Sequence, residues 1–133
     1  MAAPDKHVQT RLKRELIIWI ATVGRDGHPH VVPVWFWWDG KFVVIYAVPG
    51  QKVRDIQANP NVALHLNTDP VGDDVVRIDG TAKIDPKQPP AYQVPNYVRK
   101  YREQIKRLRL DAEGLLRPVP PRHSRHANPL SLR

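Results

Sequence analysis

Two cations follow a glycine turn in this sequence, at a spacing that suits the binding of an anion. Pro49 and Gly50 end an apolar segment, and Lys52 and Arg54 come next, in the first turns of a short helix predicted over 51–58. Free amides at a helix N-terminus attract anions, glycine lets the backbone approach a ligand, and lysine adds positive charge. The segment is therefore a candidate phosphate site, with an ordinary solvent-exposed helix start as the alternative. Arg54 could reach the same anion, or pair instead with Asp55 or a neighbouring strand.

A run of four aromatic residues, from Trp35 to Trp38, lies one hairpin away from these cations. Because side chains alternate along a strand, Trp35 and Trp37 share one face and Phe36 and Trp38 share the other. Large rings in strands usually fill a core or an interface, so we expect most of this aromatic area to be structural. One pair is expected in the core, and the other against a partner subunit or a flat ring ligand. Tyr46 on the returning strand adds a hydroxyl to an apolar ring.

The elements that would hold these residues in place are mainly strands. Asp39-Gly40 between two apolar runs is a strong hairpin signal, and the segment 24–27 has the composition of a second tight turn. Pro33 predicts either an edge position or a bulge in the second strand, and Gly80 predicts a bulge or a bend in the last. The expected elements are a helix over 5–15, strands over 16–23, 28–38, 41–48, 61–67 and 75–84, a short helix over 51–58 and a basic amphipathic helix over 95–110. Five strands in mostly hairpin connections favour a small antiparallel β-barrel with flanking helices.

The length and the charge distribution predict one folded domain with a different tail. The domain is expected over residues 1–110 of the 133, followed by an irregular, basic, proline-rich tail over 111–133. The net charge is +8, but residues 99–133 contain ten Lys or Arg and three Asp or Glu, which leaves only +1 for residues 1–98. The folded body lacks the charge excess of a dedicated nucleic-acid binder, which argues against nucleic acid as a partner. A domain of this size gains from oligomerisation when it must bury a sheet, so a homodimer is expected.

The composition also argues against several kinds of chemistry. Without cysteine the chain has no disulfide, thiolate ligand or thiol nucleophile, so any redox chemistry needs a bound cofactor. His28 with His30, and His123 with His126, lack the further ligands of a zinc site, so no metal is predicted. Neither a Walker loop nor a nucleophile elbow occurs, so hydrolysis is not expected. No segment has the length of a membrane span or the pattern of a signal peptide, so the protein is expected to be cytoplasmic, with no membrane partner.

Three segments in order, ATVGRDGHPHVVPVWFWWDG, IYAVPGQKVRDIQANPNVALHL and DDVVRIDGTAKI, resemble the pyridoxamine 5′-phosphate oxidase-like superfamily of FMN-binding split barrels. Within it, they are similar to the branch of deazaflavin (factor 420)-dependent or FMN-dependent oxidoreductases. The resemblance covers roughly residues 8–110. It implies a mainly β fold, a six-stranded antiparallel split β-barrel that forms a homodimer, with a deazaflavin coenzyme or FMN at the dimer interface.

The resemblance also implies which residues hold the cofactor of such a flavoprotein. The strand segment Val31, Val32, Pro33, Val34 and Trp35 matches the one whose backbone flanks the tricyclic ring, Tyr46 and Ala47 match contacts on the next strand, and Gln51 and Lys52 match the pair that grips the phosphate. The implied activity is hydride transfer between the cofactor and a small unsaturated or quinone-like substrate. The vitamin oxidase itself has arginine at the position of Gln51 and lysine at that of Trp35, and these departures argue against oxidation of B6 vitamers.

Catalytic side chains stay unassigned, because no residue in the sequence compels a general-acid role. Two other functions are therefore compatible with the residues. One is a non-catalytic flavin-binding module that stores or senses its ligand, and the other is a basic-tailed nucleic-acid-binding protein built on an empty barrel. The segment 115–133 resembles nothing in the family, so contacts that relatives make with their closing segment have no predicted counterpart here.

Overall fold

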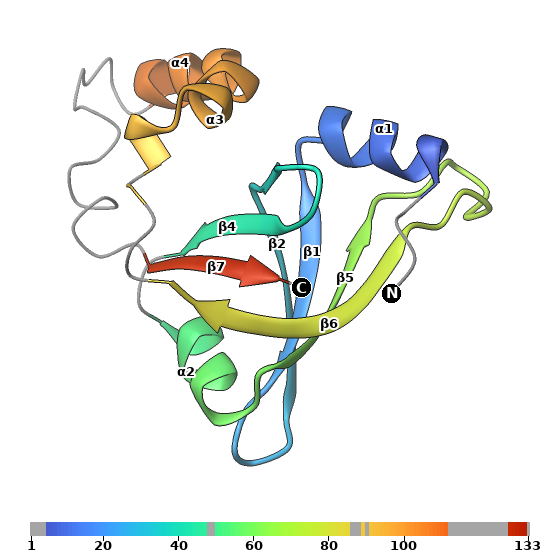
Figure 1. The fold of residues 1–133 in the computed structure, drawn as a ribbon, viewed down its shortest axis with the longest axis vertical. Helices are drawn as coiled ribbons and strands as arrows, with labels where there is room; N and C mark the ends of the chain where they lie inside the picture. The colour runs from blue at the N-terminus through green and yellow to red at the C-terminus, as the bar shows by residue number, and fades with distance from the viewer. Residues whose placement is uncertain (1–4, 48–49, 86–88, 90, 112–127, 133) are drawn as a thin grey trace.

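The fold is mainly β, with antiparallel strands and helices around them, as predicted (Figure 1). The computed structural model describes residues 5–47, 50–85, 89, 91–111 and 128–132. The helices are α1 Lys6–Arg14, α2 Gln51–Ala58, α3 Pro95–Lys100 and α4 Arg102–Asp111, with a short 3₁₀ turn η1 at Ala91–Gln93. The strands are β1 Ile18–Val23, β2 Pro29–Val34, β3 Trp37–Trp38, β4 Val43–Ala47, β5 Asn61–Leu66, β6 Arg77–Ile84 and β7 Asn128–Leu132.

The strands form one hydrogen-bonded series in the order β2-β1-β5-β6-β7-β4-β3. Strand β6 connects its two parts, because Arg77 to Thr81 pair with β5 whereas Ala82 to Ile84 pair with β7. The change of partner falls between Thr81 and Ala82, close to Gly80, where the sequence predicted a bulge or a bend. Among the described residues, β2 and β3 each have a single neighbouring strand, so the series does not close into the six-stranded barrel that the family resemblance implied.

The second predicted strand, over 28–38, is two strands in the structure. β2 ends at Val34, and β3 begins at Trp37 and continues through the predicted hairpin, in which Gly40 has a φ of 98°. Because β2 lies at the end of the strand order, Pro33 occupies an edge position, which needs no hydrogen-bond donor on the open side. Of the two alternatives for Pro33, the edge position is the one observed.

The four aromatic side chains of residues 35–38 pack into two apolar clusters, one on each face of the chain. Phe36 and Trp38 belong to the main core, together with buried side chains of β1, β4, β5 and α2. Trp35 and Trp37 pack against a second cluster centred on Tyr97 and Tyr101. The predicted alternation of the four rings is thus confirmed.

Four predictions about the helices and the C-terminal tail have different outcomes. The helices predicted over 5–15 and 51–58 are confirmed as α1 and α2. The single helix predicted over 95–110 is wrong in one respect, because Tyr101 separates α3 from α4. The absence of regular structure predicted for 111–133 is wrong for Asn128–Leu132, which form β7 between β6 and β4; residues 112–127 lie outside the described residues. None of the helices in the described ranges is long and apolar enough to cross a membrane.

Candidate functional site

Within the described residues, the N-terminus of α2 presents backbone donors without partners. Gly50 occupies the N-cap position and provides no capping side chain, and the first backbone bond of the helix runs from the amide of Arg54 to the carbonyl of Gly50, 3.0 Å away. The amides of residues 51–53 precede that bond. The ammonium of Lys52 is half-buried and forms no salt bridge within the described residues, and burial lowers its pKa. Donors and an uncompensated cation of this kind suit an anion such as a phosphate.

A buried carboxylate on the same helix joins α2 to two strands. Asp55 is 1% exposed and accepts three hydrogen bonds of 2.7 Å, from the hydroxyl of Thr22 on β1, Nδ1 of His30 on β2 and Nε2 of Gln51. Because an ionised carboxylate only accepts, the Nδ1 atom of His30 carries a proton in this contact. The carboxylate therefore fixes α2 against the beginning of β2.

The electrostatics of Asp55 follow from these contacts. Burial by itself would raise the pKa of this carboxyl, but hydrogen bonds from Gln51, Thr22 and His30 outweigh burial and hold the pKa below its ordinary value. The packing around it is tight, because a Cβ atom on Gly24 would lie 2.8 Å from Oδ1 of Asp55. A side chain at position 24 would displace the carboxylate, so glycine is required there.

The first turn of α2 contains a short relay of side chains that begins at this carboxylate. Gln51 uses its amide nitrogen to bind Asp55, and its amide oxygen accepts a hydrogen bond of 3.1 Å from Nη2 of Arg54. Arg54 pairs with Gln51 and not with Asp55. Both ends of the Gln51 side chain are thus occupied, whereas the guanidinium of Arg54 is exposed and keeps further N–H groups.

The strand predicted to flank a ring extends away from this point. Val31 and Val32 are 52% and 38% exposed, and Pro33 is exposed as well, so β2 offers an apolar edge to a ligand or a partner subunit. Val34 packs against the main core. The ring of Trp35 stacks on Tyr101, with centroids 4.4 Å apart and an angle of 4° between the planes.

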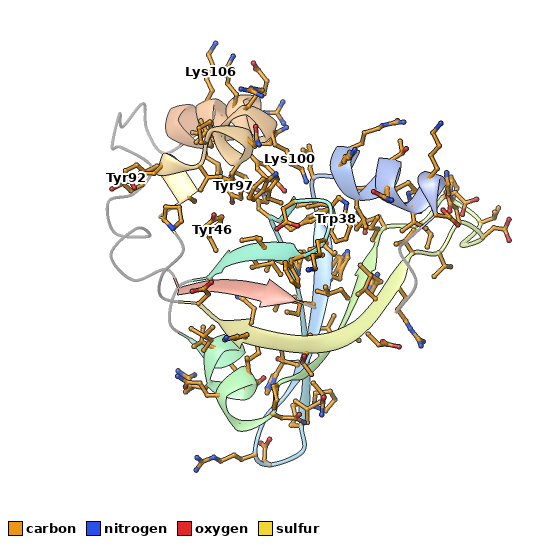
Figure 2. All side chains as sticks on the ribbon, viewed as in Figure 1. Trp38, Tyr46, Tyr92, Tyr97, Lys100 and Lys106 are labelled. Carbon is orange, nitrogen blue, oxygen red and sulfur yellow. The ribbon has the colours of Figure 1, made fainter. Side chains whose placement is uncertain are left out.

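Trp35 is the first member of a series of aromatic contacts that ends at β4. Tyr101 lies 5.0 Å from Tyr97, and Tyr97 lies 5.0 Å from Tyr46 in an edge-to-face contact, distances taken between ring centroids. Figure 2 shows Tyr46 and Tyr97 facing each other between β4 and α3. Within the described residues the buried hydroxyl of Tyr46 has no hydrogen-bond partner, and burial raises its pKa. Ala47, the next residue, is buried in the main core.

Tyr101 anchors this cluster to the rest of the chain. Its hydroxyl lies 2.7 Å from the carbonyl oxygen of Leu16 and 2.9 Å from that of Phe36, to either of which it can donate its single proton, and it accepts a bond of 2.9 Å from the amide of Phe36. Burial raises the pKa of Tyr101 and of Tyr97. Both phenols are therefore neutral donors at neutral pH.

Lys100 completes the cluster from α3. Its ammonium donates to the carbonyl of Phe36 at 2.9 Å and lies 3.7 Å from the centroid of the Phe36 ring. Burial lowers the pKa of Lys100 to about 8, although Glu15 favours the charged form. Such a cation–π contact compensates part of the lost hydration.

The structure divides the predicted site residues between two places. Gln51, Lys52 and Arg54 lie together on the first turn of α2, and the contact of Asp55 with His30 connects that turn to β2. Trp35 and Tyr46 belong to the aromatic cluster under α3. Sequence reasoning missed Asp55, Tyr97, Tyr101 and Lys100 as members of these two groups, and no local pattern in the sequence indicates their roles. In the part of the chain that the structure describes, no three His, Cys, Asp or Glu side chains could hold a metal ion.

The fold and this arrangement define a class of protein. The family model for pyridoxamine 5′-phosphate oxidase matches residues 4–127, and the chain therefore belongs to the pyridoxamine 5′-phosphate oxidase family. This confirms the resemblance found in the sequence. No curated protein matches the chain.

Solved structures with the same fold span several functions. The chain is similar to an F420 reductase, with 26% sequence identity, a TM-score of 0.70 and coverage of 98% of this chain and 94% of the other. It is similar in fold to General Stress Protein 26 from Bacillus anthracis, with 21% identity, a TM-score of 0.63 and coverage of 95% and 84%. It is also similar in fold to the heme storage protein HutZ from Vibrio cholerae, with 13% identity, a TM-score of 0.59 and coverage of 99% and 90%. The same fold thus occurs in a reductase, a stress protein and a heme storage protein.

Proposed function

We propose that this protein is an oxidoreductase that binds a deazaflavin coenzyme or FMN and transfers hydride to or from a small unsaturated or quinone-like substrate. The observation that carries the proposal is the junction of β2 with α2. There, an exposed apolar strand begins next to a helix N-terminus with unpaired amides and an uncompensated lysine. Membership of a family that binds FMN-type flavins, and the similarity to an F420 reductase over nearly the whole chain, support it.

The dimensions of the junction suit a ligand with a flat ring at one end and a phosphate at the other. The carboxylate of Asp55 binds His30, and the four further residues of β2 extend about 13 Å from there to Val34, which Trp35 follows. Val31 to Trp35 would line the ring, and Lys52, Arg54 and the first-turn amides of α2 would bind the phosphate. When bound, such a cofactor supplies the hydride chemistry, while the chain orients it and excludes water from the ring.

A homodimer belongs to the same proposal. Strand β2 lies at the edge of the sheet, and its exposed valines are suited to contact with a second copy of the chain. Sedimentation of the purified protein would measure the assembly state directly. A monomer at micromolar concentration would contradict a site shared between two subunits.

Cofactor binding is tested by the absorbance of the purified protein, followed by titration with FMN and with the deazaflavin coenzyme. We expect one of them to bind with a Kd below about 100 μM, a free energy of binding of at least about 5.5 kcal/mol. If neither does, the proposed function fails. If one binds but no hydride acceptor is ever reduced, the protein is a storage or sensing module.

Lys52 is expected to carry a large share of the affinity for the phosphate. Lys52→Ala should weaken cofactor binding by about 1.5–3 kcal/mol, the usual contribution of a hydrogen bond to a charged group. Lys13→Ala on α1 is the matched control, because Lys13 is exposed and its loss removes the same charge on a helix that lies far from α2 in Figure 1. Equal affinities of the two variants for the cofactor would remove Lys52 from the site.

A further inference from the structure

The hydrogen bonds that begin at Asp55 reach the proposed anion site, and the inference drawn from them rests on the proposed function. We infer that Asp55 is a positioning residue for the phosphate site, acting through Gln51 to present Arg54, so that Arg54 and Lys52 are the side chains that bind the anion. This changes the role that the family resemblance implied for Gln51, from a ligand of the phosphate to a link between Asp55 and Arg54.

The side-chain amide of Gln51 is hydrogen-bonded at both its nitrogen and its oxygen. Its amide nitrogen donates to Oδ1 of Asp55 at 2.7 Å, and its amide oxygen accepts from Arg54 at 3.1 Å. A carboxamide that is held at both ends cannot turn its nitrogen toward a phosphate without losing the bond to Asp55. The orientation of this amide is also fixed, because a carboxylate requires the nitrogen and a guanidinium requires the oxygen.

The guanidinium of Arg54 keeps N–H groups with which it can bind an anion. Only Nη2 of its guanidinium is bound to Gln51, and the residue forms no salt bridge with a carboxylate in the described residues. The remaining N–H groups can address an anion as a planar, two-pronged donor. Because Gln51 is neutral, the positive charge of Arg54 stays uncompensated at the same helix end as Lys52.

The carboxylate of Asp55 is buried, and its burial needs an explanation. A buried carboxylate without an Arg or Lys partner is expensive, so packing alone would favour an apolar residue at this position. Here the carboxylate is 1% exposed and receives donors from β1, β2 and α2, and Gly24 leaves the space that it fills. The carboxylate therefore fixes the orientation of three groups: helix α2, strand β2 and the side-chain amide of Gln51, which binds Arg54. Among the described residues, the titratable side chain that contacts Asp55 is His30, and the imidazole of His28 packs against the imidazole of His30.

Binding of each cofactor and of its phosphate-free form, riboflavin for FMN and the corresponding deazariboflavin for the deazaflavin coenzyme, separates positioning of the anion site from general stability. We expect Gln51→Leu and Arg54→Gln to weaken binding of the phosphate form about tenfold and to leave the phosphate-free form within about twofold. Asp55→Asn should weaken the phosphate form by at least as much as Gln51→Leu does. Arg77→Gln, an exposed arginine on β6, is the control for loss of one positive charge. Equal loss for both forms in Asp55→Asn would make Asp55 merely structural and overturn the inference, as would an unchanged affinity of Gln51→Leu.

Titration with inorganic phosphate tests the same relay without any cofactor. In the wild-type protein we expect the amide resonances of residues 51–54 to shift as phosphate is added, and Asp55→Asn and Gln51→Leu should reduce the apparent affinity for phosphate about tenfold. Wild-type resonances that do not move would overturn the inference, whereas absence of cofactor binding with a normal phosphate response would contradict only the proposed function.

Discussion

The Asp55 junction and the aromatic cluster under α3 both join segments that are distant in sequence, but they do so by different means. Around Asp55, one carboxylate receives three hydrogen bonds of 2.7 Å from three elements. In the aromatic cluster, stacked and edge-to-face rings of Trp35, Tyr101, Tyr97 and Tyr46 share a large apolar area, and one hydroxyl anchors them. Figure 1 shows α3 and α4 above β4 and α2 below β6, on opposite sides of the strands β4, β7 and β6.

This difference determines how each region should respond to substitution. Hydrogen bonds to a buried carboxylate depend on direction, so displacement of one atom disturbs all the partners. Ring packing depends on area, so it tolerates small changes and fails when a large ring is removed. Stability should therefore be lost most in the aromatic cluster, and ligand geometry should be lost most at the Asp55 junction.

The largest effect on stability is expected at Tyr101, which is fully buried. Tyr101→Ala should lower the free energy of unfolding by about 3–5 kcal/mol, because it leaves a cavity under Trp35 and removes the anchor to Leu16 and Phe36. Tyr101→Phe keeps the ring and should lower it by about 1–3 kcal/mol, since the amide of Phe36 then has no acceptor. Urea denaturation measures both.

Tyr92→Phe is the control for these variants, because Tyr92 is 56% exposed and lies on η1 outside the ring contacts. Its free energy of unfolding should stay within about 0.5 kcal/mol of the wild-type value. If Tyr101→Phe and Tyr92→Phe are equally stable, the anchoring role of the Tyr101 hydroxyl is wrong and the cluster depends on ring area alone.

A medium effect is expected at Gly24, where the substitution acts on the other region. Gly24→Ala places a Cβ atom 2.8 Å from Oδ1 of Asp55 and should lower the free energy of unfolding by about 1–3 kcal/mol by overpacking. Gly72→Ala is a useful comparison, because its φ of 73° causes strain of about 1–2 kcal/mol with no atom within 4 Å of the added carbon. Calorimetry compares their stabilities. Only Gly24→Ala should also weaken the phosphate response of α2, and an equal response in both variants would mean that the Asp55 carboxylate does not control the site.

The same contrast explains which features could be predicted from the sequence. Hairpin turns, the short helices α1 and α2 and the alternation of the aromatic run follow from local residue patterns, and the structure has all of them. The candidate phosphate site was found because Gly50, Lys52 and Arg54 are neighbours in the chain. The lysine and arginine do lie on the first turn of α2.

The features that were missed depend on contacts between distant residues. Asp55 meets His30 across 25 positions and Tyr101 meets Phe36 across 65, and no local pattern predicts such pairs. β7 was missed for a related reason: its five residues include Pro129 and gain their strand structure from pairing with β4 and β6 on either side. The break at Tyr101 likewise lies where this side chain reaches Leu16 and Phe36.

The smallest effect is expected at Lys100, and it concerns the dependence of stability on pH. Its pKa is about 8 in the folded protein and 10.5 ordinarily, so between these values the unfolded chain binds more protons than the folded one. The free energy of unfolding contributed by this group therefore rises as pH increases from about 8 toward 10.5. Screening of the partly exposed ammonium should limit the rise to about 1 kcal/mol.

Lys100→Met keeps the apolar stem and should lose this rise, whereas Lys106→Met, which removes a lysine that points away from the molecule in Figure 2, should keep it. Urea denaturation from pH 7.5 to 9 stays below the range in which the raised pKa values of Tyr46, Tyr97 and Tyr101 act appreciably with the opposite sign. Parallel curves for Lys100→Met and the wild type would show that the Lys100 ammonium is as well solvated in the folded chain as in the unfolded one, and that the aromatic cluster, unlike the Asp55 junction, holds no buried charge.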